Sequence, residues 1–139
     1  MFNMIKHFNS LFFLILISFF TSLAVADEGD PLPAKVQQIS VNDAKKLYDS
    51  GAKFVDTRTS IEMYFGVIKN AVAINKRAVS KKASSLIPNK EEIIVTYCAW
   101  GVRANVAAEN FIKLGYKNVY VIHDAGFSDW KKAGYPTTN

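Results

Sequence analysis

Cysteine and histidine are nearly absent from this sequence of 139 residues, which excludes internal disulfides and disfavours a zinc site. Cys98 is the only cysteine, so no disulfide can form within the chain. It is therefore a reactive thiol, a partner in an intermolecular bridge, or an inert buried side chain. His123 is the only histidine after His7, and one cysteine with one histidine gives poor support for a zinc site. We expect no metal and no other cofactor.

Long basic runs and long apolar runs are also missing. The formal net charge is +5, but no basic run exceeds the pairs Lys76-Arg77 and Lys81-Lys82. A charge this diffuse does not favour nucleic acid as a partner, although it is compatible with small anionic substrates. The apolar stretch over residues 11–26 is 16 residues long, short of the roughly 20 that span a bilayer. We therefore expect no stable membrane insertion.

The amino terminus has the organisation of a secretory signal peptide. Lys6 gives it a positive charge, the apolar segment LFFLILISFF follows, and Ala24-Val25-Ala26 provides small residues before a cut. We expect residues 1–26 to be removed, so that Asp27 becomes the new amino terminus. The protein is then exported, and it is periplasmic if the source is a Gram-negative bacterium.

Beyond the signal peptide, helical and extended patterns alternate along the chain. Residues 27–38 are expected to be a flexible lead-in, because Pro31 and Pro33 oppose regular structure. Residues 39–139 are expected to form one domain. Helical spacing of apolar residues predicts helices over 41–48, 60–65, 80–86, 104–114 and 128–133. Short apolar runs predict strands over 53–56, 71–74, 92–97 and 118–122.

The strand EIIVTY, residues 92–97, is apolar on both faces, which is typical of a central strand in a parallel sheet. Strands that alternate with helices through short connections give an α/β sheet with helices on both faces. In such open sheets, ligands bind beyond the carboxyl ends of the strands. Cys98 follows this strand directly, so the fold places its thiol where a site is expected.

The loop from Cys98 to Arg103 has the composition of an anion-binding loop. Successive backbone N–H groups and the unpaired donors of the next helix form a cradle that favours a thiolate over a thiol. Gly101 permits a positive φ in this tight loop, and Arg103 offers a fork of donors to an anionic group. A cysteine that merely packs in the core is the competing interpretation, and the strand–loop–helix context disfavours it.

Three segments together resemble the rhodanese sulfurtransferase family over about residues 39–136. VDTRTSIEMYFGVIKNAVAI, residues 55–74, is similar to the amino-terminal signature of that family. CAWGVRA, residues 98–104, matches its active-site loop of a cysteine, four residues and an arginine. LGYKNVYVIHDAGFSDWKKAGYP, residues 114–136, is similar to its carboxyl-terminal signature. Three such segments in this order and spacing make the resemblance specific.

The resemblance implies a three-layer fold with a five-stranded parallel sheet, in which Cys98 carries sulfur as a persulfide. Cys98 would take sulfur from a small anionic donor such as thiosulfate and pass it to cyanide, a thiol or a protein acceptor. Backbone N–H groups of the following loop would stabilise the sulfur anion. The residues of this loop are Ala99, Trp100, Gly101, Val102 and Arg103. We expect the protein to be a monomer.

Other functions stay open at this point. The same thiol could serve a non-enzymatic carrier that receives persulfide from one protein and delivers it to another. The phosphatase and arsenate-reductase relatives of the family use a loop one residue longer, which fits a larger oxyanion. The four residues between Cys98 and Arg103 therefore favour sulfur. A protease dyad of Cys98 with His123 is disfavoured, because nothing orients the histidine.

Several residues outside the loop have both a structural and a functional interpretation. Asp56 and Arg58 follow a strand expected beside the cysteine strand, and they form a charge pair that supports the site or fixes the sheet edge. Glu62 is expected to be structural and to pair with Arg58. Trp100 either walls the pocket or is exposed for a partner, whereas Trp130 is expected in the core.

The sequence departs from the family pattern at a few positions. The Gly-His-Ile step reads Gly66-Val67-Ile68, and the glycine that follows it reads Asn70. Asparagine tolerates a positive φ, so this change is mild. The late Gly-Gly-Phe reads Ala125-Gly126-Phe127. None of these changes lies in the cysteine loop.

Overall fold

The computed structural model describes residues 35–138, so the predicted cleavage site and most of the predicted lead-in lie outside the described residues. The strands are β1 (Gln37–Ile39), β2 (Lys53–Asp56), β3 (Val67–Ile68), β4 (Val72–Ala73), β5 (Ile93–Tyr97), β6 (Asn118–Ile122) and β7 (Thr137–Thr138). The helices are α1 (Val41–Asp49), α2 (Ser60–Tyr64), α3 (Val79–Leu86), α4 (Val102–Lys113) and α5 (Phe127–Lys132).

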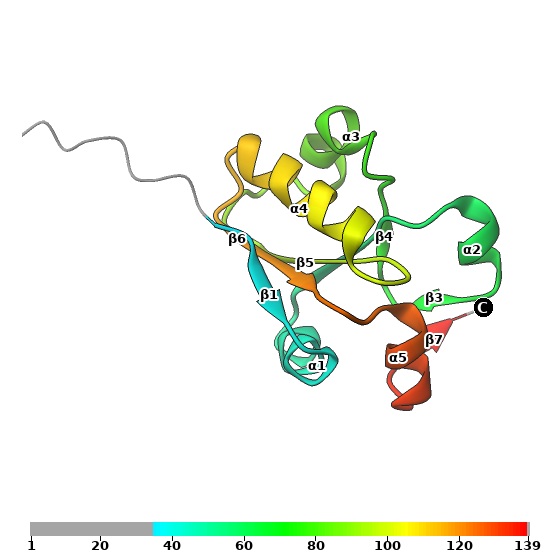
Figure 1. Ribbon diagram of the computed structural model, residues 1–139. Helices are drawn as coiled ribbons and strands as arrows, with labels where there is room; N and C mark the ends of the chain where they lie inside the picture. Colours follow the sequence, from blue (N-terminus) through cyan, green and yellow to red (C-terminus); the bar gives the residue numbers. More distant parts are fainter. Residues whose placement is uncertain (1–34, 139) are drawn as a thin grey trace, which may run out of the picture. The chain divides into compact units, whose positions relative to one another are not determined.

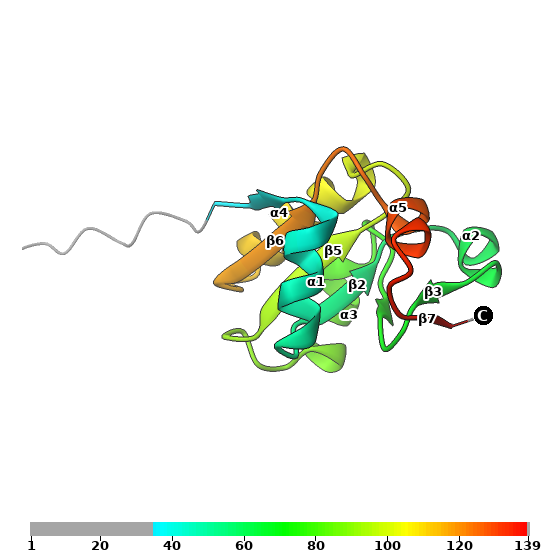
Figure 2. The same ribbon diagram turned by 90° about the horizontal axis from the view of Figure 1, so that it is seen from below.

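Five of the strands form one parallel sheet in the order β1-β6-β5-β2-β4, with β5 at its centre. Figure 1 shows α3 and α4 on one side of this sheet and α1 and α5 on the other. The predicted α/β fold, a five-stranded parallel sheet with helices on both faces, is confirmed. Strands β3 and β7 form a separate antiparallel pair, which lies beside α2 in Figure 2.

Each face of the sheet has its own hydrophobic core. On one face, Ala107 and Phe111 of α4 pack with Ile94 of the central strand. On the other face, Trp130 of α5 packs with Phe54 of β2, and their ring centroids are 5.2 Å apart. Trp130 is fully buried, so its predicted place in the core is confirmed. The two cores fix β5 from both sides and so fix the position of the residue that follows it.

Side-chain caps explain where the first two helices begin. Ser40 caps α1, because its Oγ accepts a hydrogen bond from the N–H of Asp43 at 3.1 Å. Thr59 and Glu62 form a capping box at the start of α2, each side chain bonding the backbone of the other residue. Asn70 has a φ of +66°, the conformation expected for the residue that replaces a glycine there.

Two element boundaries differ from the prediction and one strand pair was not predicted, each for a physical reason. The lead-in ends earlier than predicted, because Gln37 and Gln38 pair with β6 as an edge strand held by backbone bonds rather than by apolar side chains. Helix α4 begins at Val102 rather than Ala104, because Gly101 adopts a left-handed conformation as its N-cap. The pair β3–β7 was not predicted, since two residues per strand are too few for a periodic pattern.

Within residues 35–138, no helix combines the length and the hydropathy that crossing a membrane requires.

Candidate active site

Cys98 lies between the central strand β5 and helix α4. Asp56, the last residue of β2, is in register with Tyr97, the last residue of β5, so both strand ends meet at one edge of the sheet. Only 1% of Cys98 is exposed. Its Sγ accepts a hydrogen bond from the N–H of Gly101 at 3.0 Å. The structure therefore gives the thiol a backbone donor at the carboxyl edge of the sheet.

Two glycines shape the cysteine loop. Gly101 has a φ of +94°, and a Cβ there would lie 3.0 Å from the carbonyl oxygen of Ile122. A Cβ on Gly126 would lie 2.2 Å from the carbonyl oxygens of both Cys98 and Ala99, which is too close for any side chain. The N–H of Phe127 then donates to the carbonyl oxygen of Cys98 at 3.0 Å. The segment before α5 thus clamps the backbone on which the thiol is held.

Several amides of this loop have no acceptor within the described residues. The first hydrogen bond of α4 runs from the N–H of Asn105 to the carbonyl of Gly101 at 2.8 Å. The N–H groups that precede it lack an intrahelical partner, as at any helix amino terminus. Between residues 35 and 138 no acceptor is bonded to the N–H groups of Ala99, Trp100, Val102 or Arg103. These donors are available to an anion carried by Cys98.

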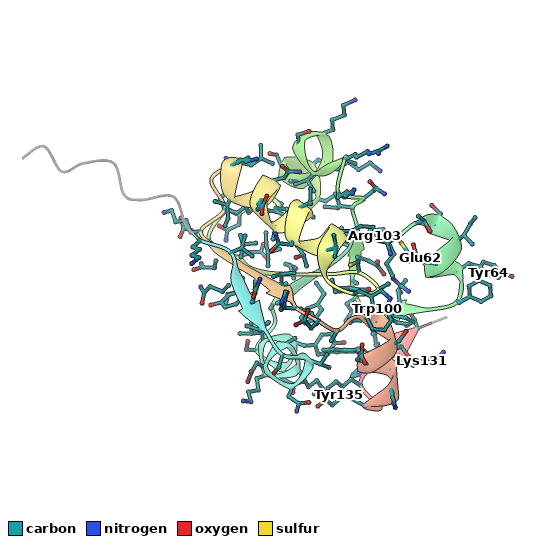
Figure 3. The ribbon with its side chains drawn as sticks, viewed as in Figure 1. Glu62, Tyr64, Trp100, Arg103, Lys131 and Tyr135 are labelled. Atoms are coloured by element: carbon teal, nitrogen blue, oxygen red, sulfur yellow. The ribbon has the colours of Figure 1, made fainter. Side chains whose placement is uncertain are left out.

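Arg103 is bound by a carboxylate. Its two terminal nitrogens donate to the two oxygens of Glu62, each at 2.7 Å. This hydrogen bonding raises the pKa of Arg103 and holds the pKa of Glu62 well below its usual 4.5. Figure 3 shows the two side chains facing each other between α2 and the start of α4. Glu62 therefore binds two of the donors that the sequence predicts for an anion, while Cys98 also contributes to the raised pKa of Arg103.

The predicted pairing of Glu62 with Arg58 is wrong. Arg58 reaches only the backbone oxygen of Glu62, at 3.4 Å, because its guanidinium is already bound by Asp56. The carboxylate of Glu62 instead joins Arg103 to the N–H and Oγ1 of Thr59, both at 2.8 Å. Glu62 thus links the first turn of α2 to the first turn of α4.

Asp56, Arg58 and Tyr97 form a buried network at the same edge. The guanidinium of Arg58 donates to Asp56 Oδ2 at 2.7 Å, and the hydroxyl of Tyr97 donates to the same oxygen at 2.7 Å. The Tyr97 oxygen in turn accepts from the N–H of Ile68 at 3.1 Å. Among the described residues no buried side-chain nitrogen or oxygen lacks a partner. The charge pair predicted for Asp56 and Arg58 is therefore present as part of a fully bonded unit.

The electrostatics of this network favour a charged guanidinium on Arg58 and a neutral phenol on Tyr97. Burial lowers the pKa of Arg58, but the hydrogen bond and the charge of Asp56 outweigh burial and raise it. Burial, followed by the charge of Asp56, raises the pKa of Tyr97 far above its usual value. The guanidinium of Arg58 also lies over the ring of Phe127, 4.1 Å from its centroid. Arg58 thus connects the end of β2 to the segment that clamps the cysteine loop.

An open pocket of about 560 Å³ brings these parts together. One wall comes from α2, one from the cysteine loop and one from α5, and Figure 3 labels Glu62 and Lys131 on two of them. The lining residues are Arg58, Glu62, Phe65, Ala99, Phe127, Ser128, Lys131 and Lys132. Cys98 does not line the pocket itself, but it adjoins two lining residues, Ala99 in the chain and Phe127 through its carbonyl oxygen, so it lies next to the pocket.

Sequence reasoning did not assign five of these lining residues. For Phe127, Ser128, Lys131 and Lys132 the sequence did contain a signal. Their segment, GFSDWKK, follows β6 and so lies at the edge of the sheet that carries Cys98. Phe65 had no such signal, since an aromatic residue at the end of a short helix is equally compatible with a core position. The unassigned residues are Phe65, Phe127, Ser128, Lys131 and Lys132.

Trp100 and His123 lie in a different hollow, of about 320 Å³, on the flank of the loop formed by α4 and the end of β6. Trp100 is 72% exposed. His123 faces Asp124, with 3.2 Å between Nε2 and Oδ1. In the part of the chain that the structure describes, no hydrogen bond joins His123 to Cys98. The structure gives no support to a Cys98–His123 dyad.

Across residues 35–138, no three side chains of His, Cys, Asp or Glu are grouped in a way that could hold a metal ion.

Comparison with known proteins adds the context for this site. The rhodanese-like domain family matches residues 40–133. A thiosulfate sulfurtransferase of Pseudomonas aeruginosa is 29% identical over 100 residues, which cover 72% of this chain and 87% of that protein. The crystal structure of a rhodanese-related protein from Thermoplasma volcanium is similar with a TM-score of 0.62 and 26% identity, covering 73% of this chain and 97% of that one.

Other matched relatives are much longer than this chain. A tRNA uridine(34) hydroxylase of Hamiltonella defensa is 33% identical over 78 residues, which cover 53% of this chain and 22% of that protein. The chain therefore spans about a fifth of the length of this relative.

Proposed function

The chain belongs to the rhodanese-like domain family, and we propose that it is a sulfurtransferase that carries sulfane sulfur on Cys98. Its relatives include a protein named thiosulfate sulfurtransferase, and thiosulfate is the donor that we propose. The proposal depends most on one observation, the hydrogen bond from the Gly101 N–H to Cys98 Sγ at 3.0 Å. Through this bond a backbone N–H holds the sulfur of Cys98, in a loop whose other N–H groups have no acceptor within the described residues.

The first step loads sulfur onto the enzyme. The thiolate of Cys98 attacks the outer sulfur of thiosulfate and forms a new S–S bond, while the S–S bond of thiosulfate breaks and sulfite leaves with its electron pair. The amides of the loop stabilise the negative charge on the transferred sulfur, as fixed donors do in an oxyanion hole. Lys131 and Lys132 supply positive charge in the pocket, and Arg103, although bound by Glu62, adds positive charge next to Cys98.

The second step unloads the sulfur. A nucleophilic acceptor attacks the outer sulfur of the Cys98 persulfide, and Cys98 leaves as a thiolate with the electrons of the broken bond. With cyanide as the acceptor the product is thiocyanate. The donor leaves before the acceptor reacts, so ping-pong kinetics are expected.

Turnover with small substrates tests this proposal. The purified protein is incubated with thiosulfate and cyanide, and thiocyanate is measured over time. We expect sustained turnover that Cys98→Ser lowers by about a thousandfold or more, because that variant lacks the nucleophile. Loading without turnover would replace the proposal with the persulfide carrier, and hydrolysis of an aryl phosphate would replace it with a phosphatase.

We also propose that the chain is exported, that it is cut after Ala26, and that it acts as a monomer. The signal-like organisation of residues 1–26 supports the first two statements. An exported enzyme of this class encounters small anionic donors together with thiol or protein acceptors. Nothing in the charge pattern favours nucleic acid as a partner.

A further inference from the structure

The short helix α2 exposes apolar side chains at the mouth of the Cys98 pocket. Tyr64 is 81% exposed and Phe65 68%, and their rings meet edge to face with centroids 5.5 Å apart. None of the residues of α2 is buried. Figure 3 shows Tyr64 pointing away from the body of the molecule. The helix is held by the polar contacts of Glu62, so its apolar residues contribute little to the hydrophobic core.

This apolar group is part of a larger rim. Ile61 is also exposed on α2. Phe65 lines the pocket itself. Exposed apolar groups of this kind mark contact surfaces, and aromatic residues are enriched at the centres of protein interfaces. We call Ile61, Tyr64 and Phe65 the aromatic rim.

The opposite wall of the pocket carries positive charge that no carboxylate neutralises. Lys131 and Lys132 of α5 line the pocket, and neither forms an ion pair within residues 35–138. The other charged lining residues are already paired, Arg58 with Asp56 and Glu62 with Arg103. The charge of the mouth therefore attracts an acidic group beside the apolar contacts.

The buried sulfur limits how an acceptor can react. Cyanide is small enough to enter the pocket without contact with Ile61 or Tyr64, which do not line it. A larger acceptor must present its nucleophile on a narrow projection while its flanks rest on the rim and near the two lysines. A cysteine on a protruding polypeptide segment has this shape, with its thiol at the tip and neighbouring residues on either side.

We propose that the aromatic rim together with Lys131 and Lys132 docks a protein acceptor that presents a cysteine thiol between apolar and acidic residues. This rests on the proposed sulfurtransferase function. The acceptor thiolate attacks the outer sulfur of the Cys98 persulfide, a new S–S bond forms on the acceptor, and Cys98 leaves as a thiolate. The acceptor thiol gives its proton to water, and the product is a persulfide on the partner, with no external oxidant or reductant.

Model acceptors test this docking surface. The protein is first loaded with thiosulfate, and the sulfur on Cys98 is confirmed by intact mass. It then reacts with one of two heptapeptides, both with a central cysteine between leucine and phenylalanine, one carrying aspartates at its ends and the other lysines. We expect the aspartate peptide to react about tenfold faster at low salt, since two weak charge contacts each contribute a few-fold. High salt should reduce this ratio.

Variants separate docking from chemistry. Replacing Ile61 and Tyr64 by serine should lower the rate with the aspartate peptide by about fivefold or more, while the rate with cyanide stays unchanged, because neither residue lines the pocket. Leu86→Ser, at an exposed leucine on α3, is the matched control. Lys131→Glu with Lys132→Glu should reverse the preference between the two peptides, whereas Lys81→Glu with Lys82→Glu on α3 should preserve it.

Several outcomes would overturn the proposal. Equal rates with the two peptides in the unaltered protein would contradict the role of Lys131 and Lys132 in recognising acidic residues. An equal loss of rate with cyanide and with peptide in the Ile61 and Tyr64 variant would contradict the role of these residues in docking. Sedimentation with phosphatidylglycerol vesicles that depends on Tyr64 would assign the rim to a membrane surface instead. A concentration-dependent dimer that Tyr64→Ser disrupts would assign it to a second copy. Failure of the proposed function is distinct, because no sulfur would then load onto Cys98.

Discussion

At the scale of single residues, the geometry of the cysteine loop depends on positions where no side chain fits. Gly101 turns the chain with a positive φ and brings its N–H to the sulfur of Cys98. Gly126 lets a second segment approach the carbonyl oxygens of Cys98 and Ala99. Since the amides of the loop can only stabilise sulfur when their direction is fixed, these contacts connect backbone packing to the proposed sulfur transfer.

Gly101→Ala is expected to damage both stability and turnover. A positive φ alone costs an alanine about 1 to 2 kcal/mol, and the contact of its Cβ with the carbonyl oxygen of Ile122, 3.0 Å away, adds strain. Gly51→Ala is the matched control, because Gly51 has a similar φ of +92° but nothing within 4 Å of its Cβ. Urea unfolding and thiocyanate formation are measured for both variants.

We expect Gly51→Ala to lose only the conformational part of the stability and to keep its turnover. Gly101→Ala should lose more stability and at least about tenfold in turnover, because displaced donors no longer meet the sulfur. Equal effects of the two substitutions would show that the contact with Ile122 is unimportant.

The buried charge network makes a second prediction at this scale. Asp56→Asn leaves the guanidinium of Arg58 buried without its carboxylate, and removing one partner of a buried pair costs about 3 to 5 kcal/mol. Tyr97→Phe, which removes one hydroxyl from the same network, should cost about 1 to 3 kcal/mol. The control is Asp49→Asn in the exposed pair with Lys45, expected to cost less than about 1 kcal/mol. A similar small cost for Asp56→Asn would contradict the account.

The residue roles were only partly predictable from sequence. Cys98, Gly101 and the pair Asp56–Arg58 follow from strand ends and local spacing, since each interaction lies close in sequence or at one sheet edge. The partner of Glu62 did not follow, because Arg58 and Arg103 both lie near the expected edge and the direction of α2 decides between them. The capping box Thr59–Glu62 was readable in the sequence and would have shown that Glu62 faces the start of α2.

At the scale of secondary-structure elements, α2 is the least integrated helix. It buries no residue, so it depends on its capping box and on the ion pair with Arg103. The same ion pair ties α2 to the start of α4, and therefore the rim of the pocket to the cysteine loop. Removal of the Glu62 carboxylate is therefore expected to destabilise the rim of the pocket and the start of α4.

Glu62→Gln is predicted to have a pH-dependent effect on stability. Arg103 holds the pKa of Glu62 below its usual 4.5, so Glu62 stabilises the folded state fully above pH 4.5, and this contribution is lost as the pH falls towards the lower folded-state pKa. We expect the variant to be less stable by about 1 to 2 kcal/mol at pH 7, from the lost pair and cap. The difference from the unaltered protein should shrink as the pH is lowered below 4.5.

Urea unfolding at several pH values measures this difference. Glu91→Gln is the matched control, because Glu91 pairs with Lys117 at 2.6 Å on the exposed surface and should contribute less than about 1 kcal/mol. A difference for Glu62→Gln that grows on acidification would have the wrong sign for this account.

The elements themselves were largely predictable, and the exceptions share a cause. Strands β2, β5 and β6 have apolar runs, and α1, α4 and α5 have apolar residues at helical spacing, so their patterns are independent of the rest of the fold. Strand β1 lies at the edge with exposed glutamines, and β3 and β7 have two residues each. Such strands exist because a neighbouring backbone pairs with them, which no local pattern reveals.

At the scale of the whole molecule, one edge of the sheet carries the ends of β2 and β5, the start of α4 and the start of α5. Each element is held by one of the two cores. Packing on both faces of the sheet therefore holds these elements, and with them the site, in place. Helix α2 adds polar and apolar residues at the edge of the site.

Export makes a prediction for the chain as a whole. When the full sequence is expressed in a Gram-negative host, we expect the protein in the periplasmic fraction with Asp27 as its first residue, because Ala24 and Ala26 are small residues suited to signal cleavage. Amino-terminal sequencing and intact mass measure this. Replacing Ala24 and Ala26 by large residues should block the cut, and a mature protein that still begins at Met1 would contradict the prediction.

The central claim is that Cys98 holds the transferred sulfur, and the intact mass of the protein tests it most directly. After incubation with thiosulfate and removal of small molecules, we predict a gain equal to one sulfur atom, which cyanide reverses. Cys98→Ser should show no gain under the same conditions. No gain in the unaltered protein, or the same gain in Cys98→Ser, would contradict the account.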